Sequence, residues 1–187
     1  MTYEELQDVA CKDGIDVIER RFKSDNIKGL YCNGVVAVNK DIETQKEKSC
    51  VLAEEIGHDR TSYGDILDQN DIMNRKQEYR ARLYGYNLKV GLTGLIRAYE
   101  SGCRNIFEMA EYLDATEEYL KEALLCYKSK YGICTAVDNY IIYFEPFAVM
   151  KFVAAEWMQR FYYWSDIQND RISPEIDKPT GWRLNFV

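Results

Sequence analysis

The only histidine of the chain, His58, ends a run that begins at Val51 and holds two adjacent glutamates, Glu54 and Glu55. The run favours a helix, on which residues 54 and 58 share one face. In helices with the zinc-peptidase motif H-E-x-x-H, metal ligands stand at positions i and i+4 and the general base at i+1. His58 matches i+4, Glu55 matches i+1, and Glu54 stands where the first histidine would be. Because carboxylates also ligate zinc, the run predicts a metal site on a helix.

Length and charge narrow the class of protein. The chain has 187 residues, 47% of them apolar, which is enough for a compact core. Its net charge of -7, from 24 basic and 31 acidic residues, argues against a general nucleic-acid binder. We find no uncharged apolar run that would span a membrane and no secretory-type start. The six cysteines form no C-x-x-C pair, so we expect reduced thiols and a cytoplasmic protein.

The patterning predicts an α+β fold that is mostly helical, with a small β-hairpin or sheet. The hairpin is predicted around Asn33-Gly34, because both residues tolerate positive φ. A strand is expected from Asp138 to Phe144, and Thr116 is a good N-cap for a helix. The predicted helices cover residues 3–22, a segment ending near residue 58, residues 72–89, three shorter segments within 92–130, and residues 147–164. This reading divides the chain into a core at 1–91, a helical module at 92–135, and a strand, aromatic helix and irregular tail at 136–187.

A catalytic metal site needs a third protein ligand beyond Glu54 and His58. Glu78 is the best candidate, because it lies on the predicted helix that follows the His58 helix after one loop. A short loop of this kind folds two helices antiparallel. The alternative for Glu78 is a surface ion pair on the same helix, with Arg75 three residues before it or Arg82 four residues after it.

Several motifs, taken jointly and in order, resemble the ImmA/IrrE family of metallo-endopeptidases over roughly residues 1–135. They are Gly29-Leu30-Tyr31 through Asn39, the run from Cys50 to His58, the stretch from Thr61 to Ile66, and Glu78 with Ala81 beyond it.

The resemblance implies a minimal zincin-like core followed by a helix-turn-helix-like helical module. It implies metal-dependent, site-specific cleavage of a helix-turn-helix repressor, the role of phage and mobile-element anti-repressors. His58, Glu54 and Glu78 are then the metal ligands, and Glu55 is the general base. The expected metal is Zn²⁺, although an oxygen-rich set is less selective against Mn²⁺ or Fe²⁺. In the loop that follows, a tyrosine and four aspartates could approach the metal, although a capping or solvated role is the commoner one for each: Asp59, Tyr63, Asp65, Asp68 and Asp71. Of these, Tyr63 is a candidate for stabilising an oxyanion.

The competing hypothesis is a pseudo-peptidase that regulates by binding and does no chemistry. A lone histidine is more often structural than a metal ligand, and a Glu-Glu pair usually lies on a solvated face. The joint spacing of Glu54, Glu55 and His58 nevertheless favours the metal site. Residues 106–124 have the cadence of a helix-turn-helix, but the second helix would begin with Glu117 and Glu118, which phosphate would repel. The aromatic stripe from Phe147 to Trp164 is interpreted as a core-facing helix, with docking of a repressor as the alternative.

Overall fold

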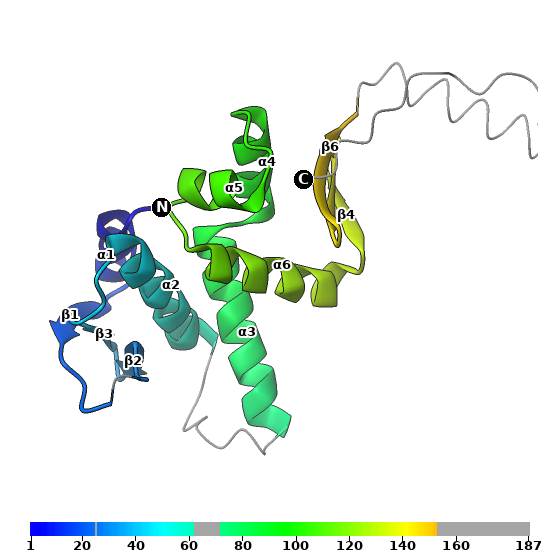
Figure 1. The fold of residues 1–187 in the computed structure, drawn as a ribbon. Helices are drawn as coiled ribbons and strands as arrows, with labels where there is room; N and C mark the ends of the chain where they lie inside the picture. The colour runs from blue at the N-terminus through cyan, green and yellow to red at the C-terminus, as the bar shows by residue number, and fades with distance from the viewer. Residues whose placement is uncertain (25, 62–71, 153–187) are drawn as a thin grey trace, which may run out of the picture.

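The structure is a computed structural model that describes residues 1–24, 26–61 and 72–152. In this part of the chain six helices and two three-stranded sheets form an α+β fold, as predicted (Figure 1). Among these residues, no helix combines the length and the apolar character that crossing a bilayer requires. The helices are α1 (Tyr3–Lys12), α2 (Gln45–Thr61), α3 (Ile72–Lys89), α4 (Leu92–Glu100), α5 (Ile106–Tyr112) and α6 (Glu117–Tyr131).

The first sheet has the order β1-β3-β2, with β1 (Asp16–Arg20) parallel and β2 (Gly29–Cys32) antiparallel to β3 (Val35–Asn39). The predicted hairpin is confirmed: Asn33 and Gly34, between β2 and β3, have φ values of 47° and 79°. The predicted helix over residues 3–22 is wrong beyond Lys12. Gly14 adopts a φ of 76° and ends the helical path, after which the β-branched residues of β1 pair with β3.

Helices α1 and α2 cover one face of the first sheet. Leu6 from α1, Val36 and Val38 from β3, and Leu52 and Ile56 from α2 are all fully buried in one cluster. The sheet and α1 thereby fix the position and the rotation of α2, which carries three of the four predicted site residues.

Two glycines bring α2 and α3 into close antiparallel contact. A Cβ atom added to Gly57 would collide with the Ala81 carbonyl oxygen, and one added to Gly85 would lie 2.8 Å from the Ala53 carbonyl oxygen. Only glycine permits such an approach of two helix backbones. The crossing sets residues 54–58 of α2 against residues 78–85 of α3.

The remaining helices build a second core on the other side of α3. Thr116 caps α6 as predicted, because its side chain accepts a hydrogen bond from the Tyr119 backbone N–H at 3.1 Å. This core also includes residues of α2 and α3, so the helical module and the first lobe share packing. Its largest fully buried members are Tyr86, Tyr127, Leu95, Met109, Leu120 and Ile142.

The second sheet has the order β4-β5-β6 and packs one face on the helical module. The predicted strand is confirmed as β5 (Tyr140–Phe144), which pairs antiparallel with β4 (Cys134–Val137) and with β6 (Phe147–Lys151). The prediction of a helix from Phe147 is therefore wrong over β6, because the turn at Glu145-Pro146 returns the chain along β5. The rest of that predicted helix, residues 153–164, and the predicted tail lie outside the described residues.

Candidate metal centre

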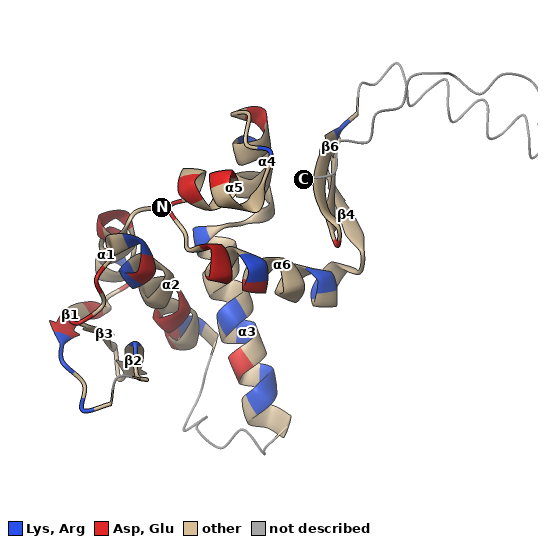
Figure 2. Cartoon of the chain, viewed as in Figure 1, with Lys and Arg blue, Asp and Glu red and all other residues tan. Residues whose placement is uncertain are grey.

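The α2–α3 crossing places His58 and Glu78 opposite each other. The Nε2 atom of His58 lies 3.5 Å from Oε2 of Glu78. The other carboxylate oxygen of Glu78, Oε1, accepts a hydrogen bond from Nε of Arg82 at 2.7 Å, one turn further along α3. Glu78 is the only acidic residue of α3, and basic residues lie on both sides of it (Figure 2). The predicted surface pair of Glu78 with Arg82 is therefore confirmed, and the other carboxylate oxygen, Oε2, faces His58.

The separation of His58 and Glu78 is an ion-pair distance that is also compatible with two metal ligands. Two donors that each lie about 2.0–2.1 Å from a tetrahedral Zn²⁺ ion are about 3.3 Å apart. The observed 3.5 Å is close to this value and long for an ordinary hydrogen bond. The distance between the two side chains is therefore compatible with two ligands on one ion.

Burial sets the charge of His58. It lowers the pKa of the imidazole below its ordinary value, and the neighbouring Glu78 carboxylate only partly opposes this effect. The ring is therefore neutral at pH 7, which is the form that ligates a metal.

Glu54 is a largely buried carboxyl group one turn before His58. Burial is the main cause that raises its pKa to about 7, and the charges of Glu122 and Glu78 raise it further, whereas Arg82 lowers it. Glu122 on α6 also accepts a hydrogen bond from the Tyr86 hydroxyl at 3.1 Å. Glu54 consequently lies where α2, α3 and α6 meet, and Lys28 acts with Arg82 to lower its pKa against the two acidic neighbours.

Glu55 points toward the first sheet. A Cβ atom added to Gly29 on β2 would lie 2.6 Å from Oε1 of Glu55, so this carboxylate packs directly on the β2 backbone. Burial and then the charge of Glu54 raise the pKa of Glu55 to about 8, while a hydrogen bond from the Tyr31 backbone lowers it. A carboxyl group that titrates near neutral pH has the basicity required of a general base.

The structure brings together only part of the predicted site. Among the residues that it describes, no group of three or more His, Cys, Asp or Glu side chains is arranged to hold a metal ion. Tyr63, Asp65, Asp68 and Asp71, which the sequence places in the loop after α2, lie outside the described residues. Asp59, the first acidic residue after His58, accepts a hydrogen bond from the Tyr31 hydroxyl.

Two further residues contact the candidate site: Tyr31, whose role sequence reasoning missed, and Arg82, which it named only as a surface partner of Glu78. Tyr31 links β2 to α2 twice, through its backbone to Glu55 and through its hydroxyl to Asp59. Arg82 holds Glu78 and lowers the pKa of Glu54. The spacing of four residues between Glu78 and Arg82 was visible in the sequence, whereas the Tyr31 contacts depend on how the first sheet meets α2.

Comparison of the chain with protein-family models, with curated proteins and with solved structures finds no match.

Proposed function

We propose that this protein is a metal-dependent endopeptidase that acts in the cytoplasm and cleaves a helix-turn-helix repressor. His58, Glu78 and Glu54 are the proposed metal ligands, and Glu55 is the proposed general base. The observation that carries the proposal is the 3.5 Å between His58 Nε2 and Glu78 Oε2, on two helices that glycines hold in contact. The choice of substrate rests on the resemblance of the sequence motifs to the ImmA/IrrE family.

The donor set suits a divalent cation of borderline hardness. A neutral imidazole and two carboxylates are ligands for Zn²⁺, and the second carboxylate also admits Mn²⁺ or Fe²⁺. Glu54 and Glu55 are both partly buried and both have raised pKa values, so a cation near either carboxylate would stabilise its ionised form. The residues present thus fit a metal in their chemistry.

The proposed chemistry divides the work between the cation and Glu55. A bound divalent cation would polarise the scissile carbonyl and make water more acidic. Glu55 then removes a proton from the attacking water and later delivers it to the leaving amine. For this step the carboxylate must exchange its hydrogen bond with the Tyr31 backbone for one with the water.

Glu55→Gln tests the proposed chemistry, because it keeps the shape of the side chain and removes its basicity. In cells that co-express a candidate repressor, we expect wild-type protein to cleave it and Glu55→Gln to leave it intact while still binding metal. Glu43→Gln, an exposed position before α2, is the matched control and should cleave normally. Full cleavage by Glu55→Gln would refute the role of this residue.

The second candidate is a regulatory binding protein without catalysis. The hydrogen bond from the Tyr31 backbone to Glu55 favours it, because this bond gives the carboxylate a structural task on β2. Binding to DNA is disfavoured, since Glu117 and Glu118 fill the first turn of α6. Metal uptake separates the two candidates: the regulatory protein needs none.

A further inference from the structure

The second sheet has an apolar face turned away from the helical module. Strand registers place six residues on this side, in rows that run across the three strands. We call it the outer face, and it consists of Cys134, Ala136, Ile141, Tyr143, Ala148 and Met150. The opposite side chains, including Ile142, Phe144 and Val149, lie in the core against the helices.

The composition of the outer face departs from that of a solvated sheet. An antiparallel sheet with one face in water normally alternates apolar and polar side chains along each strand. The outer face has no charged or amide side chain, although Ile141, Tyr143 and Met150 are partly exposed and Cys134 is exposed. The corresponding face of the first sheet carries Asp16 and Arg20 at its edge strand. A continuous apolar face of this kind indicates a covering partner.

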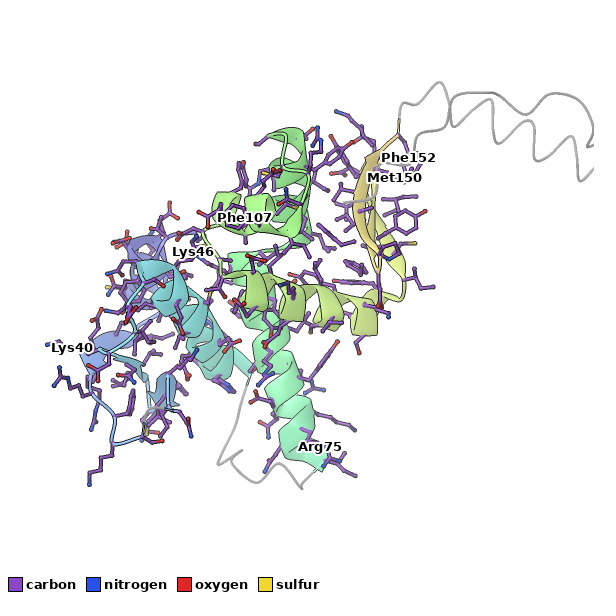
Figure 3. The ribbon with its side chains drawn as sticks, viewed as in Figure 1. Lys40, Lys46, Arg75, Phe107, Met150 and Phe152 are labelled. Atoms are coloured by element: carbon purple, nitrogen blue, oxygen red, sulfur yellow. The ribbon has the colours of Figure 1, made fainter. Side chains whose placement is uncertain are left out.

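The chain itself supplies a suitable partner. The described structure ends at Phe152, directly after β6, the edge strand that carries Met150 (Figure 3). Residues 153–187 follow without a break, and their first twelve residues include only two charged ones, Glu156 and Arg160. All three tryptophans of the chain, Trp157, Trp164 and Trp182, belong to this segment.

We propose that the outer face is the docking site of residues 153–187 of the same chain. A covalently attached segment has a high effective concentration at a neighbouring surface, which favours it over a separate molecule. The apolar and aromatic side chains after Phe152 match the apolar outer face in chemistry. This proposal is independent of the metal site and of the proposed peptidase function.

Tryptophan fluorescence of the full chain tests the proposal without added labels, because every tryptophan lies in the proposed docking segment. We expect blue-shifted emission with weak acrylamide quenching in the wild type. Ile141→Lys places a charge in the middle of the outer face, and should shift the emission to the red and strengthen the quenching. Ile18→Lys, at an exposed isoleucine of the first sheet, is the matched control and should leave both unchanged.

Circular dichroism establishes that each variant is folded, and Met150→Lys on β6 repeats the test if Ile141→Lys unfolds. Wild-type emission typical of tryptophan in water would overturn the proposal, as would emission that neither substitution changes. Blue-shifted emission that is lost on dilution would also overturn it, because a second copy of the chain would then cover the outer face.

Discussion

Glu54→Gln should change how the stability of the metal-free protein depends on pH. The pKa of Glu54 rises from 4.5 to about 7 in the folded protein, mainly through burial. Each pKa unit corresponds to about 1.4 kcal/mol, so ionised Glu54 costs the folded state at most about 3.5 kcal/mol. Because the pKa of Glu54 is raised in the folded state, the protein avoids this cost below pH 4.5, where the carboxyl group is neutral. The corresponding stability is lost as the pH rises through about 7.

The wild-type protein should therefore lose unfolding free energy between about pH 4.5 and pH 7 through Glu54, and Glu54→Gln should lose less of it. The variant and the wild type should be similar in stability near pH 5, whereas near pH 8 the variant should be more stable by about 2–3 kcal/mol. Removal of the Glu54 charge should also lower the pKa of Glu55, since that charge is the second cause of its rise.

Urea unfolding of the metal-free protein at several pH values measures this pH dependence of the unfolding free energy directly. The slope of each unfolding transition shows whether the folded state stays compact. Glu43→Gln controls for the loss of one carboxylate at an exposed position. If the unfolding free energies of the wild type and Glu54→Gln depend on pH in the same way, burial does not raise the pKa of Glu54, and the reasoning is refuted.

Three other predictions follow from the same contacts. Arg82→Met should release Glu78 and so weaken metal binding roughly 10–100-fold, as the loss of a residue that holds a metal ligand does. Arg80→Met, at an exposed position on the same helix, should leave metal binding unchanged. Calorimetric titration with Zn²⁺ measures the affinity of both variants. Gly57→Ala should lower the unfolding free energy by about 1–3 kcal/mol, because the new methyl group meets the backbone of α3; an unchanged thermal midpoint would contradict the close crossing. Saturating Zn²⁺ should reverse the loss of stability above pH 7, since metal binding favours the ionised carboxylate of Glu54; thermal melts with and without metal test this.

Local signals in the sequence predicted much of the fold. The hairpin was predictable because Asn33-Gly34 fixes a turn within two residues, and α6 because Thr116 caps it within one turn. The end of α1 was not predictable, because the apolar stripe continues through Val17. Only pairing with β3 makes that stretch a strand. At Phe147 the apolar residues fit both a helical and a strand period, and pairing with β5 decided the outcome.

The candidate site was predictable only as a spacing along two helices. Glu54 and His58 share a helical face by geometry alone, and Gly57 beside them enables the close contact with α3. The rotation that turns Glu78 toward His58 depends on packing of α3 against two cores, which no local pattern encodes. For the same reason the sequence does not reveal that Glu55 lies against β2.

The proposed function depends on His58 and Glu78 holding one divalent cation between α2 and α3. Elemental analysis after dialysis against Zn²⁺, for the wild type and for His58→Ala and Glu78→Ala, tests it most directly. We expect about one equivalent of metal in the wild type and little in either variant, because losing one ligand leaves an incomplete site. A wild-type protein that takes up no metal on titration, or variants that retain the wild-type amount, would contradict it.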